Sequence, residues 1–130
     1  MSQHRVTIHA DDAPPAAGPY SHAVRSQGFL FLSGQTPLDP QTKALVEGDI
    51  GAQTRQCLDN LQAVARAGGA TLADAVRVGI YVTDMGTFAD VNKAYAEYFP
   101  ADPPARSTIV VASLPLGAQV QIDCVLAHPG

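Results

Sequence analysis

Two apolar stretches in the last quarter of the chain decide the fold: Pro-Pro-Ala-Arg-Ser-Thr-Ile-Val-Val at residues 103–111 and Val-Gln-Ile-Asp-Cys-Val-Leu at residues 120–126. Both are rich in β-branched residues and bounded by Pro and Gly, so each predicts a strand. Each also carries one ionisable side chain among apolar neighbours, Arg106 in the first and Asp123 in the second. Because side chains alternate faces along a strand, we expect the faces that hold Ile109 and Ile122 to turn to the core.

The size and composition predict one domain spanning residues 1–130, large enough to bury about two thirds of its unfolded surface. Only 15% of the residues are charged, which is low for a protein that stays monomeric and favours an oligomer. The net charge of -4, with no run of Lys or Arg, argues against a nucleic-acid partner. No apolar run approaches the ~20 residues of a membrane helix, so we expect no membrane partner either.

The cysteines and histidines predict no cofactor. Cys57 and Cys124 form no CxxC pair, and the sequence shows no secretory segment, so we expect a reduced, cytoplasmic protein in which both are small buried hydrophobes. The four histidines are scattered without metal-ligand spacing. We therefore expect neither a metal nor another cofactor.

The first half of the chain predicts strands followed by a long helix. Residues 5–9 alternate apolar and polar side chains, and residues 22–26 and 29–32 flank a Gln-Gly hairpin signal. After an irregular loop, Asp49 is placed to cap a helix that ends at Gly68. The apolar residues of this helix recur at helical spacing: Ile50, Thr54, Cys57, Leu58, Leu61, Val64 and Ala65.

The second half predicts a strand, a helix and the two final strands. Residues 74–84 place Val76, Val78, Ile80 and Val82 on one face, and the opposite, mixed face could meet a neighbouring subunit. Thr87 and Asp90 resemble a capping box for a helix that stops at Pro100. The residues that this helix should bury are Phe88, Val91, Tyr95 and Phe99. This order predicts an α+β layer of two helices on one sheet, and the residues alone would pair the last two strands as a hairpin.

Four motifs occur in a fixed order along the chain: Gly18-Pro19-Tyr20-Ser21, Ser33-Gly34-Gln35, Asn92-x-x-Tyr95-x-x-Tyr98-Phe99 and Pro104-Ala105-Arg106-Ser107-Thr108. Together they make residues 13–127 closely resemble the RidA (YjgF) family of enamine and imine deaminases. The resemblance implies a chorismate-mutase-like fold, a mixed six-stranded sheet covered on one face by two helices. In this fold the final strand lies between the third and the fourth. The resemblance also implies a homotrimer with clefts at its subunit junctions.

The resemblance further implies a reaction. The family hydrolyses 2-aminoacrylate and related imines, which dehydratases release, to a 2-oxo acid and ammonia. Arg106 would bind the substrate carboxylate, because a guanidinium offers a planar fork of donors that suits this group. The backbone N–H of Thr108 would add a donor, and the carbonyl of Arg106 would accept from the imine nitrogen. Holding the substrate in this way can contribute several kcal/mol of barrier reduction.

The remaining site residues are also carried over from the family. Its water-orienting glutamate, in a Glu-Ile-Glu-Ala phrase, matches Asp123, whose side chain is shorter by roughly 1.5 Å. Since a general base must reach its proton directly or through one water, this shortening could slow the reaction or change the substrate. Tyr20 and Ser33 would line the cleft, and Asn92 would lie at the subunit boundary. We expect Arg106 to come from one protomer, and Tyr20, Ser33 and Asp123 from its neighbour.

Plainer roles remain open for each of these side chains when the residues are considered alone. Arg106 and Asp123 could pair with other charges, Ser33 could cap a turn, Tyr20 could pack as an aromatic and Asn92 could be a solvated helical residue. The main functional alternative is a non-catalytic trimer that binds 2-oxo acids or other small carboxylates. Ribonuclease activity, an old label for the family, is opposed by the negative charge and by the lack of a pair of general-base histidines. Chorismate mutase is opposed because a dianionic substrate should need more than one cation.

Overall fold

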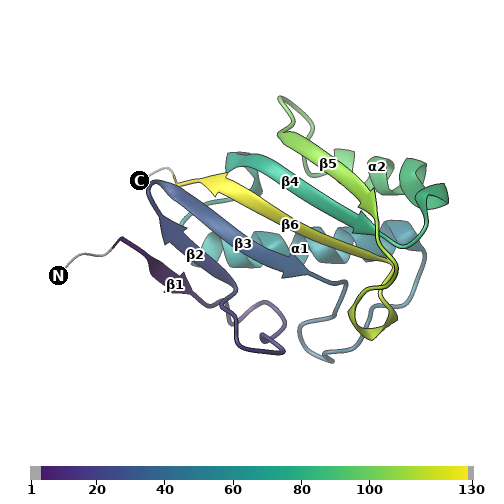
Figure 1. The fold of residues 1–130 in the computed structure, drawn as a ribbon, viewed down its shortest axis with the longest axis horizontal. Helices are drawn as coiled ribbons and strands as arrows, with labels where there is room; N and C mark the ends of the chain where they lie inside the picture. Colours follow the sequence, from purple (N-terminus) through teal and green to yellow (C-terminus); the bar gives the residue numbers. More distant parts are fainter. Residues whose placement is uncertain (1–3, 129–130) are drawn as a thin grey trace.

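The computed structural model describes residues 4–128, so the first three and last two residues of the predicted domain lie outside the described part. The strands and helices follow the expected order (Figure 1). Their bounds are β1 Val6–Ile8, β2 Ala23–Ser26, β3 Phe29–Gln35, α1 Ile50–Ala67, β4 Ala75–Val82, α2 Phe88–Ala96, β5 Ala105–Val110 and β6 Val120–Ala127.

The strands form one mixed sheet in the order β1-β2-β3-β6-β4-β5. Strand β6 lies between β3 and β4 and is antiparallel to both, whereas β5 runs parallel to β4 at the edge of the sheet. The arrangement implied by the family is therefore confirmed, and the hairpin of the last two strands is not formed. Every second residue of β6, from Val120 to Leu126, is buried. Burial of these apolar side chains is most favourable when the strand is central in the sheet and has a neighbouring strand on each side.

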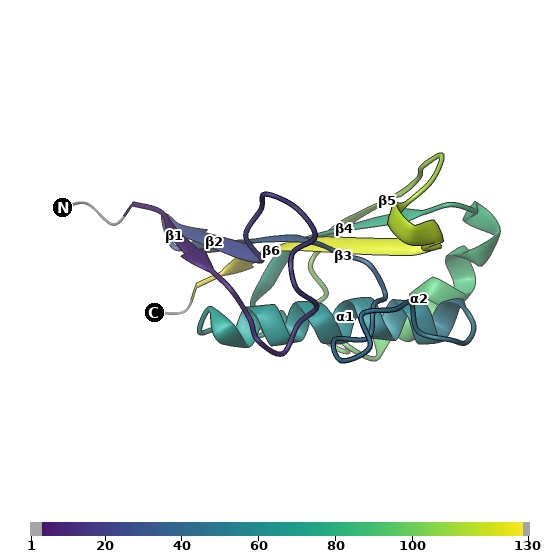
Figure 2. The same ribbon diagram turned by 90° about the horizontal axis from the view of Figure 1, so that it is seen from below.

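Both helices cover the same face of the sheet, and the other face is left uncovered by residues 4–128 (Figure 2). All seven predicted residues of the α1 stripe are buried under β3 and β6, together with Asn60. Asp49 caps α1 as predicted, because its Oδ1 accepts from the N–H of Ala52 at 2.9 Å. The β2–β3 hairpin is also confirmed, and Gln27 and Gly28 both have positive φ, as a type I′ turn requires.

The face assigned to the core is wrong for one of the two deciding stretches. Ile122 is fully buried, but Ile109 is 49% exposed, and it is the Arg106 and Thr108 side of β5 that turns toward the helices. Strand β5 lies at the edge of the sheet beside the short helix α2, so its helix-facing side can combine apolar packing with a charged group. Periodicity could not show this, because both faces of β5 carry β-branched residues.

Four further local predictions are corrected, one on β4 and three at α2. Val76 was expected on the buried face of β4 with Val78, but it is 43% exposed. A register irregularity between Ala75 and Arg77 breaks the alternation of faces, so Val76 does not point to the same side as Val78. Helix α2 ends at Ala96 instead of Pro100, and Phe88 at its start is partly exposed. Thr87 makes no side-chain cap hydrogen bond, because its hydroxyl donates to the carbonyl of Asp84.

Both thiols are buried, and burial disfavours the thiolate. It raises the pKa of Cys57 strongly and that of Cys124 to about 12. We expect neither thiol of the folded protein to react with a thiol-exchange reagent at pH 8, and both to react at once in denaturant, as absorbance of the released chromophore would show. Rapid labelling of either cysteine under native conditions would contradict this packing.

Candidate functional site

Arg106 is held against helix α2. Its Nη2 donates to Asn92 Oδ1 at 2.7 Å, and its guanidinium carbon lies 4.8 Å from the ring centre of Tyr95 and 5.6 Å from that of Phe88. Asn92 and Tyr95 are one turn apart on α2, so one side of the helix supplies both contacts. The two aromatic rings were expected only as core residues, and their place beneath the cation could not be read from helical spacing.

The charge of Arg106 is not neutralised within the described chain. Across residues 4–128 the sole ion pair is Arg55 with Glu97, at 2.8 Å on the helix side. The partners of Arg106 are a neutral amide oxygen and two aromatic faces, which fix the guanidinium without supplying a negative charge. The surroundings are also apolar enough that burial raises the pKa of Tyr95 to about 12, with the cation opposing part of this rise. An anion could therefore bind without displacing a carboxylate.

The backbone beside Arg106 presents free hydrogen-bonding groups. The N–H of Val111 donates to the carbonyl of Val82 on β4 at 2.9 Å. Every second residue of a strand turns its backbone groups to the same side, so Ser107 and Ile109 also point to β4. The N–H of Thr108 and the carbonyl of Arg106 consequently point to the free edge of the sheet. These are the two backbone groups that the family resemblance assigns to substrate.

A cleft of about 320 Å³ at the end of the sheet contains one of the predicted residues. Tyr20, 47% exposed, lines this cleft with Gly34, Leu116 and Gln121. Gly34 leaves room for the side chain of Gln121, because a Cβ at this position would lie 2.6 Å from its Nε2. Ser33 is not among the lining residues, and its hydroxyl donates to the carbonyl of Ser21 at 2.7 Å. Ser33 thus ties two chain segments together, a role that differs from the turn cap of its plainer interpretation.

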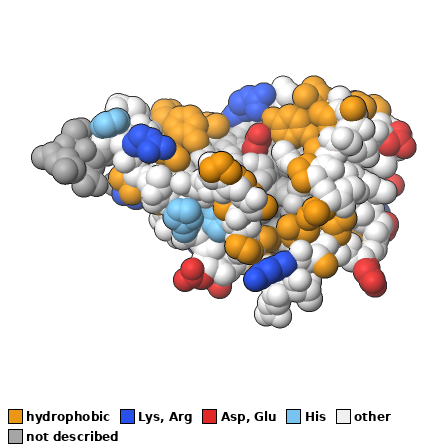
Figure 3. Space-filling model, turned by 60° about the horizontal axis from the view of Figure 1, so that its bottom comes forward, with side chains coloured by type: hydrophobic (Ala, Val, Ile, Leu, Met, Phe, Trp, Pro, Cys, Tyr) orange, Lys and Arg blue, Asp and Glu red, His pale blue; other side chains and the backbone are white. Residues whose placement is uncertain are grey.

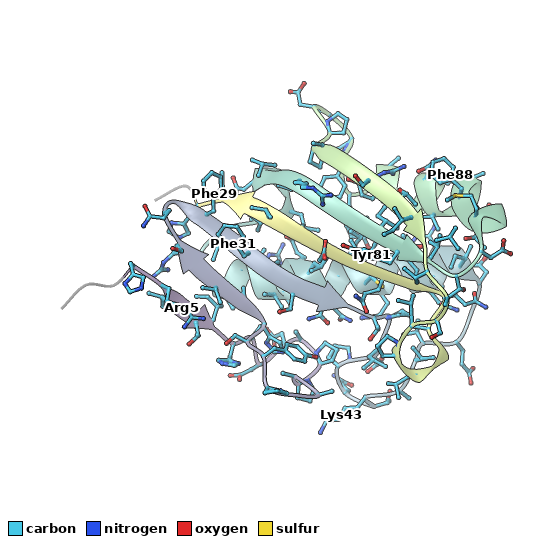
Figure 4. The ribbon with its side chains drawn as sticks, viewed as in Figure 1. Arg5, Phe29, Phe31, Lys43, Tyr81 and Phe88 are labelled. Carbon is cyan, nitrogen blue, oxygen red and sulfur yellow. The ribbon has the colours of Figure 1, made fainter. Side chains whose placement is uncertain are left out.

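Asp123 lies on the uncovered face, next to Gln121 in the same row of β6. Its Oδ2 accepts from the hydroxyl of Tyr81 at 3.0 Å. Figure 4 shows Tyr81 above the strands on this face, together with Phe29 and Phe31. Burial and the Asp123 carboxylate raise the pKa of Tyr81, so its hydroxyl remains a donor at neutral pH. Sequence reasoning placed Tyr81 on this face but could not pair it with Asp123, because the pairing depends on the strand order.

The two groups lie on opposite faces of the sheet. Val78 of β4 pairs with Arg106 and with Cys124, whereas Gly79 pairs with Ser107 and with Asp123. Paired residues share a face, so Arg106 points to the helix side and Asp123 to the uncovered side. The structure brings Arg106 together with Asn92 and Thr108, but it does not bring Arg106 to Asp123 or Tyr20 within one chain.

The uncovered face has the composition of a contact surface. Phe29, Phe31 and Ile109 are exposed there, and Leu116 is 70% exposed beside the Tyr20 cleft. Figure 3 views the molecule obliquely and shows hydrophobic side chains gathered in patches over its surface. An exposed apolar surface of this kind, interrupted by a few polar groups, is typical of a protein–protein interface.

A larger groove of about 740 Å³ lies between α1 and the loop after β1, lined among others by His9, Asp59 and Tyr98. None of the predicted site residues is in it, and Asp59 already accepts from the Tyr98 hydroxyl at 2.6 Å. We therefore place the candidate site at β5 and the Tyr20 cleft. Across the described residues, no helix is long and apolar enough to cross a membrane, and no group of His, Cys, Asp or Glu side chains is arranged to hold a metal ion.

The sheet order, with two helices on one face, defines an α+β protein of the RidA type. A family model described as Endoribonuclease L-PSP matches residues 10–128, and the chain belongs to this family, the YjgF/RidA family. The chain is 48% identical over 123 residues to Protein DfrA of Myxococcus xanthus, which covers 93% of this chain and 94% of that protein.

Two further relatives extend the comparison. Reactive Intermediate Deaminase A of Arabidopsis thaliana, a chloroplastic protein, is 42% identical over 118 residues, covering 91% of this chain and 63% of that protein. The crystal structure of the YjgF gene product from E. coli superposes with a TM-score of 0.89 at 37% identity, covering 94% of this chain and 98% of the other.

Proposed function

We propose that this chain hydrolyses reactive 2-enamine and 2-imine intermediates, such as 2-aminoacrylate and its 2-iminopropanoate tautomer, to 2-oxo acids and ammonia. The observation that carries the proposal is the uncompensated, rigidly held charge of Arg106 beside free backbone groups at the edge of β5. The substrate is small and planar and has a carboxylate at one end, which this arrangement can bind. The name of the Arabidopsis relative, a reactive intermediate deaminase, supports the same chemistry.

In the proposed mechanism the carboxylate binds the Arg106 guanidinium and the Thr108 N–H, while the imine nitrogen donates to the Arg106 carbonyl. Water adds to the imine carbon, and its proton passes through the Asp123 carboxylate to the nitrogen, which gives a carbinolamine. The carbinolamine hydroxyl then gives up its proton and the nitrogen takes one up, and breakage of the C–N bond expels ammonia while the C=O bond of the 2-oxo acid forms. Tyr20 lines the cleft, and in this proposal its hydroxyl contacts the water or the leaving nitrogen.

The site is assembled between protomers in this proposal. Arg106 and Asn92 lie on the helix side of one sheet, and Tyr20 and Asp123 belong to the uncovered face, so one chain cannot present all of them to one small molecule. A homotrimer would bury the apolar uncovered face and bring the β5 edge of one protomer to the Tyr20 cleft of the next. The exposed Phe29, Phe31 and Ile109 support this assembly.

The test generates 2-aminoacrylate in place from serine with a dehydratase and follows its conversion to pyruvate. We expect the purified protein to increase the decay rate of the intermediate in proportion to protein concentration, and light scattering to give three times the mass of one chain. Decay at the spontaneous rate, with the protein folded, would contradict the deaminase proposal. A chain that remains monomeric at the assay concentration would contradict the shared site.

One observation favours a second candidate, a trimer that binds small carboxylates without catalysis. The general-base position holds the shorter Asp123, and one of its two oxygens already accepts from Tyr81. In that case pyruvate would bind and perturb the NMR resonances of residues around Arg106, but the imine would decay no faster. The deaminase proposal requires both binding and faster decay.

A further inference from the structure

A buried imidazole, that of His22, holds the long loop between β1 and β2 (Figure 1). His22 is only 4% exposed, and both nitrogens of its ring contact backbone groups of this loop. Nδ1 lies 2.9 Å from the amide nitrogen of Ala10, and Nε2 lies 2.8 Å from the carbonyl oxygen of Pro14. The ring therefore bridges the two ends of residues 10–14.

The two partners fix the tautomer of His22. A backbone N–H can only donate, so Nδ1 must be unprotonated in order to accept from Ala10. A carbonyl can only accept, so the proton must be on Nε2, which donates to Pro14. The neutral ring with its proton on Nε2 satisfies both backbone groups, and an apolar side chain at position 22 would leave both of them unpaired.

The ring provides most of the hydrogen bonding between this segment and its surroundings. Within residues 4–128, residues 10–17 form hydrogen bonds to other parts of the chain only with the His22 ring and, at 3.2 Å, with the Tyr20 hydroxyl. His22 is itself attached to β3, because its carbonyl accepts from the N–H of Ser33 at 2.9 Å. The position of residues 10–17 relative to the sheet therefore depends on this side chain.

The same segment forms one wall of the Tyr20 cleft. Pro14, Pro15, Ala17 and Tyr20 all line it, whereas His22 does not. The N–H of Ala17 donates to the Tyr20 hydroxyl oxygen at 3.2 Å. This contact occupies an acceptor site of the oxygen and leaves the hydroxyl proton free to be donated to a ligand.

We propose that His22 is a positioning residue, whose ring fixes residues 10–17 and, through the N–H of Ala17, orients the Tyr20 hydroxyl toward the reacting water or the leaving nitrogen. This inference rests on the proposed deaminase function and adds to it a residue outside the cleft. The expected gain is preorganisation, because a hydroxyl that is already oriented needs no rearrangement when water adds to the imine.

The first experiment compares two replacements of His22 in the 2-aminoacrylate assay. His22→Leu keeps much of the bulk but neither hydrogen bond, so we expect kcat to fall about 10-fold, the ratio that one well-placed hydrogen bond supplies. KM should change by less than about 3-fold, because Arg106 binds the carboxylate without this loop. His22→Gln carries one acceptor and one donor on its amide and should restore kcat to within about 3-fold of wild type. Equal kcat in the two variants would overturn the proposal.

His9→Leu is the matched control. The His9 ring centre lies 5.8 Å from that of His22, but His9 is exposed, and its ring makes no hydrogen bond within residues 4–128. We expect wild-type kcat in this variant. A fall as large as that of His22→Leu would show that the loss does not depend on the two hydrogen bonds of His22.

Two measurements need no turnover and separate this inference from the proposed function. Nitrogen NMR of the wild type should show His22 with its proton on Nε2, and amide hydrogen exchange should show the N–H of Ala10 protected in the wild type and exchanging faster in His22→Leu. A proton on Nδ1, or an unprotected Ala10 amide in the wild type, would refute the contact itself, even if His22→Leu does not fold. The expected results in a protein without deaminase activity would refute only the proposed reaction.

Discussion

Arg106→Ala is expected to abolish most of the acceleration of 2-aminoacrylate decay. Truncating one partner of a buried charge-assisted contact costs about 2–5 kcal/mol, which corresponds to a fall in kcat/KM of roughly 30- to 5,000-fold. The loss should be large because Asn92 and Tyr95, the side chains that hold Arg106, cannot supply a positive charge in its place. Pyruvate release under conditions that saturate the wild type measures it.

Two further arginine variants make this result specific. Arg106→Lys keeps the charge but loses the planar fork and the stacking on Tyr95, so its activity should lie between wild type and Arg106→Ala. Arg55→Ala removes an arginine that is paired with Glu97 on the helix surface, and it should retain wild-type activity. Wild-type kcat/KM in folded Arg106→Ala would refute the carboxylate contact.

Ile80→Ala is expected to have the largest effect on stability. Ile80 is fully buried on β4, between β5 and the central strand β6, and truncating such a residue to alanine costs about 2–5 kcal/mol through lost burial and the remaining cavity. The free energy of unfolding should fall by this amount in urea titrations at a fixed protein concentration, which matters if the chain is oligomeric.

Val76→Ala is the control on the same strand. Sequence periodicity places Val76 in one row with Ile80, but the register irregularity turns it outward to 43% exposure. We expect its replacement to change the free energy of unfolding by no more than about 0.5 kcal/mol, as is usual for exposed positions. A loss as large as that of Ile80→Ala would mean that the irregularity is absent in solution.

Much of the local structure could be predicted from the residues, because the apolar spacing, the helix cap and the turn residues all agree with the observed fold. The α1 stripe, the Asp49 cap and the Gln27-Gly28 turn are all found where spacing and turn chemistry place them. The errors occur where long-range packing overrides these signals, at the exposed face of Ile109, at the outward Val76 and at the early end of α2. The buried side is decided by the neighbouring helix for Ile109 and by the strand register for Val76, and periodicity shows neither.

The candidate site was predictable in part. The family motifs single out Arg106, Asn92 and Thr108, and the structure brings these three to one edge of the sheet. It gives Ser33 a hydrogen bond to Ser21, which also serves local structure. The contribution of Tyr81 and Gly79 to the setting of Asp123 was missed, because a cross-strand contact requires knowledge of which strands are neighbours and in which register.

The sequence by itself determined the alternation of residues along each strand, the α1 stripe and its caps, and the motifs that mark the family, because these depend on residues close together in the chain. The position of β6 between β3 and β4 was implied by the family motifs and not by the residues alone, and only the tertiary structure decided the register that places Asp123 over Gly79 and beside Tyr81. It also decided that Arg106 lies on α2, on the side of the sheet opposite Asp123. The physical reason is that strand pairing is set by the burial of whole faces against one another, a property that no single segment carries.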